Sequence, residues 1–168
     1  MILLINGPHG VGKTSVANCI KKKTDKSCII MDSDFYYKKM INEDFYKAFG
    51  TGTTPQTNLF FIEYFIKQIQ KRKEHIKIIP FTFSNPNILD LFKNNFDTKV
   101  IHVVLQASSE DLENRIFNDK SRDKEFAISE NEITNKNIGK LENNLLIDTS
   151  SLKADEVADI IIKKQLSK

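Results

Sequence analysis

The stretch "GPHGVGKT" at residues 7–14 constrains this chain more than any other feature of its sequence. It fits the pattern Gly-x-x-x-x-Gly-Lys-[Ser/Thr], and it lies between the apolar run at 2–5 and a stretch with helical spacing. A glycine-rich turn from a strand into a helix directs backbone N–H groups and the positive helix end at phosphate oxygens. An average composition gives this pattern by chance in about one chain in two hundred of this length. We therefore predict a phosphate loop that binds a nucleoside triphosphate.

The residues of this loop have different expected roles. Its three glycines let the backbone curl around a phosphate group. Lys13 is expected to place its charge on the β and γ oxygens, and the hydroxyl of Thr14 suits a Mg²⁺ ligand. We expect the side chain of His9 to point outward from the loop. The residues predicted to bind the nucleotide are Gly7, Gly10, Val11, Gly12, Lys13, Thr14 and Ser15.

The composition is typical of one globular domain. A chain of 168 residues supports a single core, and a net charge of +3 with interspersed acids does not indicate a nucleic-acid partner. Cys19 and Cys28 lack metal-binding spacing and fit reduced thiols. The apolar opening is too short for a signal peptide or a membrane span. We expect one cytoplasmic domain over 1–168, with no membrane span and no indication of an oligomeric state.

Short apolar runs alternate with stretches of helical spacing along the chain. Strands are predicted at 2–5, 28–31, 76–81, 99–106 and 144–148, and helices at 13–23, 35–49, 58–73, 85–96, 108–118, 129–143 and 153–166. The charged stretch at 119–129 lacks periodicity and is predicted to be a loop. This alternation is typical of an α/β fold with a five-stranded parallel sheet covered by helices on both faces.

The phosphate loop occurs in GTP-binding switches, in motor ATPases and in kinases. A switch reads guanine with Asn-Lys-x-Asp, and the nearest stretch here, "NKNI" at 135–138, lacks the acid. A motor needs a longer chain and an acidic residue at the end of a strand beside the loop, but "IKIIPFTFSN" contains none. A small phosphotransferase is the class that remains.

Two carboxylates follow the second predicted strand, in the stretch "MDSD" at 31–34. Asp32 and Asp34 are therefore expected at the carboxyl edge of the sheet, where open α/β sheets bind their ligands. Asp34 could accept the proton of an acceptor hydroxyl and orient it for in-line attack, and Asp32 could hold Mg²⁺. Alternatively, Asp32 or Ser33 could cap the helix that follows.

Two arginines lie around the charged loop, which we predict to be a short lid at about 119–128. Arginine suits the spread negative charge of a transferring phosphoryl group, and a lid that closes over the phosphates excludes water. The candidate catalytic residues are therefore Lys13, Asp34, Arg115 and Arg122, and the candidate metal ligands are Thr14 and Asp32.

Folds of the kind predicted here usually bind the acceptor between the second and third strands, and in this chain that region, about 34–73, is rich in aromatic residues. Most of these aromatic side chains should fill the core. Tyr36, Tyr37 and Tyr46 are better candidates for a pocket wall, because a phenol needs a polar partner. Few arginines occur in the region, which favours a neutral hydroxyl compound such as an antibiotic or a sugar.

The stretches "INGPHGVGKT" and "VVLQASSEDLENRI", with the acidic turn after the second strand, resemble the small P-loop kinases of the nucleotide and shikimate kinase class. With "IPFTFSNP" and "IDTSSLKADEVADIIIKK", the chain is more similar still to the tunicamycin-resistance protein family. The resemblance implies a nucleoside monophosphate kinase-like P-loop NTPase fold, with ATP and Mg²⁺ as cofactors. It implies that Arg115 is the arginine after strand four and that Asp34 orients the acceptor. The Gly-Gly and extra arginines of shikimate kinases are absent here, and the helix after the lid has only lysines.

Three functions are consistent with these features. The first is a kinase that moves the γ-phosphoryl of Mg-ATP to a hydroxyl of an antibiotic, sugar or nucleoside. The second is an ATP-binding resistance protein that sequesters its ligand without phosphoryl transfer, and the third is a nucleoside or nucleotide kinase. No base-reading motif separates ATP from GTP as the donor, and by resemblance the turn at 148–152 packs the adenine.

Overall fold

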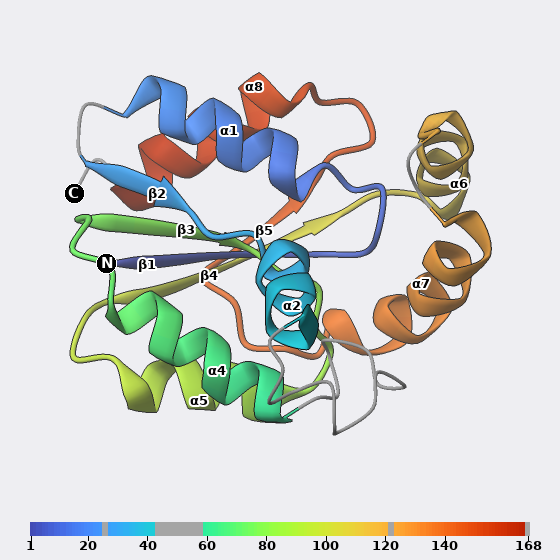
Figure 1. Ribbon diagram of the computed structural model, residues 1–168. Helices are drawn as coiled ribbons and strands as arrows, with labels where there is room; N and C mark the ends of the chain where they lie inside the picture. The colour runs from blue at the N-terminus through green and yellow to red at the C-terminus, as the bar shows by residue number, and fades with distance from the viewer. Residues whose placement is uncertain (25–26, 43–58, 121–122, 167–168) are drawn as a thin grey trace.

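Within the described residues, 1–24, 27–42, 59–120 and 123–166, five parallel strands form one sheet in this computed structural model. The strand order is β2-β3-β1-β4-β5, which places β1 at the centre (Figure 1). The strands are β1 (Ile2–Asn6), β2 (Cys28–Ile30), β3 (Ile76–Pro80), β4 (Val100–Gln106) and β5 (Leu145–Asp148). This arrangement confirms the predicted α/β fold with a five-stranded parallel sheet.

Helices cover both faces of this sheet. They are α1 (Lys13–Lys23), α2 (Ser33–Asn42), α4 (Leu59–Gln70), α5 (Pro86–Asn95), α6 (Ser109–Asn118), α7 (Lys124–Ile138) and α8 (Ala154–Ile161), which continues into a π-helical turn (Ile162–Leu166). Figure 1 shows α1 and α8 on one face, α4 and α5 on the other, and α6 and α7 beyond one end of the strands. In the described part of the chain, no helix is long and apolar enough to cross a lipid bilayer.

The central strand illustrates why the strands are continuously apolar. Successive side chains of a strand point to opposite faces, and both faces of this sheet are buried. Ile2 and Leu4 pack into the core beneath α4 and α5, whereas Leu3 and Ile5 pack into the core beneath α1 and α8. All four side chains are fully buried. The apolar run that precedes the phosphate loop therefore anchors the loop to the central, fully buried strand of the sheet.

The aromatic residues of the 34–73 region divide between core and surface. Phe61 and Phe65 of α4 are fully buried and stack with their ring centroids 5.3 Å apart. Tyr36 also lies in this core, where its hydroxyl accepts a hydrogen bond from Arg72, 3.4 Å away. Tyr37 packs against the same core. Both side chains thus lie in or against the core between α2 and α4, and their place in the wall of an acceptor pocket stays a prediction.

The largest difference from the sequence-based prediction concerns the charged stretch at 119–129. The structure begins α7 at Lys124, so the predicted loop is wrong from that residue onward. The Asp123 side chain accepts a hydrogen bond from the N–H of Phe126 at 3.1 Å and thereby starts the helix. The lid predicted at about 119–128 stays a prediction, and residues 121–122 within it lie outside the described part of the chain. Two parts of the site prediction thus lie outside the described residues. One is Arg122, and the other is the predicted helix and pocket residues at 43–58, which include Tyr46.

Asn6 ends β1 and anchors the start of the phosphate loop. Its Oδ1 accepts hydrogen bonds from the N–H groups of Gly7 (2.8 Å) and Phe83 (3.1 Å), and its Nδ2 donates to the Phe83 carbonyl (2.9 Å). The same Nδ2 lies 3.2 Å from Nε2 of His102, whose Nδ1 lies 2.6 Å from the carbonyl oxygen of Glu142. These distances fit a neutral imidazole that donates from Nδ1 and accepts at Nε2. One buried network thus joins β1, β4 and the segment after β3 beneath the loop.

We expect this network to make the protein sensitive to acid. Burial lowers the pKa of His102 below its ordinary value of 6.5, against the opposing effect of the Glu142 carbonyl, while nearby Lys93 lowers it further. The folded state therefore binds the His102 proton less readily than the unfolded state does. The contribution of His102 to stability is complete above the unfolded pKa and is lost as the pH falls through the folded pKa. Denaturant unfolding between about pH 7 and pH 5 should show this loss.

The matched control for this prediction is the exposed His75. His102→Gln should flatten the dependence of the unfolding free energy on pH, because glutamine does not titrate. His75→Gln should leave that dependence unchanged, since His75 lies at the surface. A pH dependence equally steep in His102→Gln and in the wild-type protein would contradict the assignment.

Candidate active site

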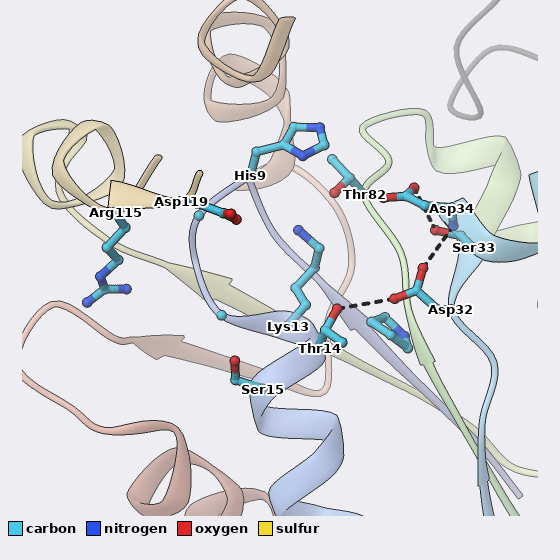
Figure 2. A pocket seen from close by; sticks show the side chains of 13 residues that line it. His9, Lys13, Thr14, Ser15, Asp32, Ser33, Asp34, Thr82, Arg115 and Asp119 are labelled. Atoms are coloured by element: carbon cyan, nitrogen blue, oxygen red, sulfur yellow. Dashed lines mark hydrogen bonds between the residues drawn. The ribbon is translucent and has the colours of Figure 1, made fainter. Parts of the chain in front are cut away.

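The phosphate loop borders a cavity of about 210 Å³ at the carboxyl edge of the sheet (Figure 2). The cavity collects most of the predicted site residues in one place, although they come from separate parts of the chain. It is lined by His9, Gly10, Gly12, Lys13, Thr14, Ser15, Asp32, Ser33, Asp34, Pro80, Thr82, Arg115 and Asp119. The predicted phosphate loop and the predicted acidic turn therefore face the same space.

The loop backbone is pressed against its neighbours at two glycines. A Cβ atom on Gly7 would lie 2.5 Å from the carbonyl oxygen of Leu105 in β4. Gly10 has a φ of 83° and would place a Cβ 3.1 Å from the carbonyl oxygen of Leu112 in α6. A larger residue would displace the loop at either position. The glycines therefore allow the loop to lie close to β4 and α6 while it curves around the cavity.

The loop leads directly into α1, whose first turn receives no side-chain cap. Gly12 occupies the position before the helix with a φ of 97°. The first N–H groups of a helix have no partner within the helix, and they carry the positive end of its dipole. The amino end of α1 therefore presents N–H donors beside the cavity, as an anion-binding loop requires.

Lys13 places its ammonium group inside the curve of the loop. Its Nζ donates hydrogen bonds to the carbonyl oxygens of Gly7 and Pro8, each at 2.8 Å. The hydroxyl of Thr82, which follows β3, donates to the same Gly7 oxygen at 3.1 Å. The positive charge is thus held over the loop, where phosphate oxygens would bind.

Asp32 connects the phosphate loop with α2. Its Oδ2 accepts a hydrogen bond from the Thr14 hydroxyl at 3.2 Å, while its Oδ1 accepts from the N–H groups of Asp34 (3.0 Å) and Phe35 (3.4 Å). The two roles that the sequence left open are therefore compatible, because one carboxylate oxygen caps α2 and the other faces Thr14. Asp34 lies in the first turn of α2 and lines the same cavity.

The Thr14–Asp32 pair fits a Mg²⁺ ion that arrives with a nucleotide. Such an ion usually takes one or two protein oxygens and completes its shell with phosphate oxygens and water. Within the described residues there is no cluster of three or more His, Cys, Asp or Glu that could hold a metal ion alone. The donor set therefore matches a nucleotide-bound cation rather than an all-protein metal site.

Arg115 lies on the other side of the phosphate loop. Its guanidinium donates to the hydroxyl (3.2 Å) and the carbonyl oxygen (2.9 Å) of Thr149, the residue after β5. Figure 2 shows Arg115 and Lys13 separated by the loop, with Asp32 and Asp34 on the far side of Lys13. Arg115 also lines a second cavity of about 310 Å³, together with Gly10, Val11, Gly12, Ser15, Val16, Thr149, Leu152, Ala154 and Val157. The wall of this second cavity combines apolar side chains with Ser15, Arg115 and Thr149, a mixture that suits a nucleobase and its sugar.

His9 differs from its sequence-based prediction. The side chain is only 8% exposed, and its ring centroid lies 5.9 Å from that of Phe126 in an edge-on contact. The prediction of an outward-pointing side chain is wrong because α7 packs over this part of the loop.

Sequence reasoning also missed four residues at the site: Thr82, Asp119, Asn131 and Thr149. Thr82 and Thr149 follow strands at the carboxyl edge, so their position relative to the strands was a usable signal. Asp119 and Asn131 belong to no short motif, and only the packing of α6 and α7 brings them to the loop.

Comparisons with known proteins agree with this geometry. The family model of chloramphenicol phosphotransferase-like proteins matches residues 1–166. No curated protein sequence matches the chain. Among solved structures, the tunicamycin resistance protein of Deinococcus radiodurans superposes with a TM-score of 0.72 and 20% identity, covering 96% of this chain and 93% of that chain.

Two further structures share the fold at lower identity. A gluconokinase from Sinorhizobium meliloti 1021 gives a TM-score of 0.67 at 13% identity over 98% of this chain and 91% of that chain. A shikimate kinase from Acinetobacter baumannii, solved with shikimate, gives 0.64 at 18% identity over 99% and 93%. These likenesses confirm the predicted resemblance to small P-loop kinases. Because the family model spans nearly every residue, the chain belongs to the chloramphenicol phosphotransferase-like family of P-loop kinases.

Proposed function

We propose that the protein transfers the γ-phosphoryl group of Mg-ATP to a hydroxyl group of a small molecule. The observation that carries this proposal is the single cavity into which the phosphate loop, the Thr14–Asp32 pair and Asp34 all face. A donor site and a general base on opposite sides of one small space are what phosphoryl transfer requires.

The donor nucleotide binds across the phosphate loop in this proposal. The N–H groups at the start of α1 and the ammonium of Lys13 hold the β and γ phosphates. The base and ribose occupy the second cavity, where Arg115, tied to Thr149, covers the nucleoside. Thr14 and Asp32 hold Mg²⁺, which neutralises charge on the transferring group when it is bound. This places Arg115 at the nucleoside, whereas the sequence suggested a contact with the transferring phosphoryl.

Asp34 acts on the acceptor. Its carboxylate accepts the proton of the acceptor hydroxyl while the hydroxyl oxygen forms a bond to the γ phosphorus. The bond between that phosphorus and the bridging oxygen breaks at the same stage, and ADP leaves with the electron pair. Lys13 stabilises the charge that develops on the bridging oxygen. The products are ADP and a phosphate monoester of the acceptor.

The charges around the cavity favour a neutral acceptor. Among its described lining residues the lysine and arginine side chains are Lys13, which faces the phosphates, and Arg115, which is turned toward Thr149. The acceptor side carries Asp34, Ser33 and Thr82 instead. An anionic acceptor would meet the carboxylate of Asp34 without a dedicated cation. The family name and the tunicamycin resistance protein further favour a hydroxylated antibiotic, with sugars and nucleosides as the other neutral classes.

A second candidate function is nucleotide-dependent sequestration of a ligand without phosphoryl transfer. It is favoured by the engagement of Arg115 with Thr149, because this arginine then gives no support to a transferring phosphoryl group. A sequestering protein would bind ATP and the second ligand together and would release no ADP beyond the background rate.

The deciding experiment is an ADP-release assay with Mg-ATP and a panel of hydroxylated antibiotics including chloramphenicol, neutral sugars, nucleosides and nucleoside monophosphates. We expect release that depends on a neutral acceptor, with the phosphorylated product identified by mass spectrometry. Replacing ATP by GTP in the same assay identifies the donor. Tight ATP binding without acceptor-dependent release would favour sequestration, and release with nucleoside monophosphates alone would contradict the neutral-acceptor assignment.

A further inference from the structure

One side chain of α7 pairs with both backbone polar groups of a phosphate-loop residue. Asn131 accepts a hydrogen bond at Oδ1 from the N–H of His9 at 2.6 Å. Its Nδ2 donates to the carbonyl oxygen of the same residue at 3.0 Å. Asn131 is only 7% exposed and lies 122 residues away from His9 along the chain. The amide therefore holds the backbone of His9 on both sides of its Cα, much as a neighbouring strand would.

The position of Asn131 on its helix makes this pairing specific. The buried residues of α7 are Ala127, Asn131, Thr134 and Ile138. An amide on a buried helix face is costly unless both of its ends are hydrogen-bonded. Asn131 meets that requirement through the N–H and the carbonyl oxygen of His9. The loop contact accounts for a polar side chain at a position that packing alone would give to an apolar residue.

The same region of the loop is confined from two sides. Gly10 packs against the carbonyl oxygen of Leu112 and the side chain of Ile116 in α6. His9 packs edge-on against Phe126 of α7. Because the N–H of His9 is already engaged, the phosphate must be bound by N–H groups later in the loop. The curve of those later residues depends on where the backbone of His9 is held.

We propose that Asn131 is a positioning residue that holds the phosphate loop in its nucleotide-binding shape, so that α7 completes the nucleotide site. The proposal rests on nucleotide binding by the loop, and it is independent of the acceptor. Asn131 does not touch the phosphates in this assignment. It acts through His9, and its loss should weaken the binding of phosphate groups more than the binding of the nucleoside.

The test compares three variants of the full-length protein. Asn131→Leu removes both hydrogen bonds, and Asn131→Asp keeps the shape and the acceptor but loses the donor to the His9 carbonyl. Asn135→Leu is the matched control, because Asn135 lies one turn later on α7 and is exposed. Three probes are used. A non-hydrolysable Mg-ATP analogue occupies the whole nucleotide site, Mg-tripolyphosphate tests binding to the phosphate loop alone, and adenosine tests binding to the nucleoside cavity.

We expect Asn131→Leu to raise the Kd for the ATP analogue and for tripolyphosphate by about tenfold, the effect of one or two lost hydrogen bonds. Asn131→Asp should raise these two Kd values at least as much. Its negative carboxylate would face the carbonyl oxygen of His9 and would lie near the bound phosphate. The Kd for adenosine should change by less than about twofold in both, and Asn135→Leu should match the wild-type protein with every probe.

Two results would overturn the proposal. One is a lower melting temperature of the Asn131 variants with unchanged Kd values for tripolyphosphate and the ATP analogue, which would show a structural role alone. The other is an equal loss of affinity for all three probes. If Asn131→Leu does not fold, the isosteric Asn131→Asp decides the question. The wild-type assays of ADP release test the proposed function separately, because a protein that binds ATP without transferring a phosphoryl group would still need its loop positioned.

Discussion

Asp34→Asn should nearly abolish acceptor-dependent ADP release while leaving the affinity for Mg-ATP almost unchanged. Asparagine has the shape of aspartate but cannot accept the acceptor proton, and general-base catalysis contributes roughly 10²- to 10⁴-fold to a rate. Asp34 lies in the first turn of α2, and the group that it donates to Asp32 is its backbone N–H. The substitution should therefore preserve the cap of α2. Steady-state ADP release and a separate nucleotide-binding titration measure the two effects.

Asp32→Asn is the comparison that separates the two carboxylates. Asp32 contacts Thr14 and caps α2, so its loss should weaken the binding of Mg-nucleotide and reduce turnover together. A large effect of Asp34→Asn on ATP affinity, or a normal rate of ADP release in that variant, would contradict the assignment of Asp34 as the base. If Asp32→Asn alone abolished turnover with unchanged nucleotide binding, the general base would be Asp32.

Lys13→Ala should weaken Mg-ATP binding by roughly 10- to 150-fold. A hydrogen bond to a charged group contributes about 1.5–3 kcal/mol, and this range converts to that loss of affinity. The Nζ of Lys13 already lies 2.8 Å from two loop carbonyl oxygens, so little reorganisation is needed before it meets a phosphate. Adenosine binding in the second cavity should change little. Titration of the variant with the ATP analogue and with adenosine measures both quantities.

Lys13→Arg tests whether charge alone is sufficient. The planar guanidinium is wider than an ammonium group and cannot take the same place between the carbonyl oxygens of Gly7 and Pro8. We expect it to restore only part of the affinity. Lys21→Ala, at the exposed end of α1, serves as the control for a lost positive charge. Equal losses in Lys21→Ala and Lys13→Ala would show that net charge, rather than the position of Lys13, determines binding.

The predictions that succeeded concern features that are close together in the sequence. The phosphate loop is recognisable in the sequence because its glycines, Lys13 and the start of α1 lie within a few residues of one another. Strands and helices were recognised where one apolar face repeats along the chain, as in β1 and α4. The prediction failed at the start of α7, residues 124–128, where Ala127 is the single buried residue. Hydrophobic periodicity is consequently weak there, and the charged stretch has the pattern of a loop.

The sequence by itself determined the class of the protein, the order of its strands and helices along the chain, and the phosphate loop. Only the tertiary structure decided which side chains meet that loop. Asp32 contacts Thr14 and also caps α2 because α2 begins beside Thr14. The guanidinium of Arg115 is hydrogen-bonded to Thr149, and Asn131 binds the backbone of His9 from 122 residues further along the chain. A short motif is governed by local backbone geometry, whereas these contacts depend on how helices pack against a sheet. That packing is the sum of many weak contacts between distant residues, and no short stretch of sequence contains it.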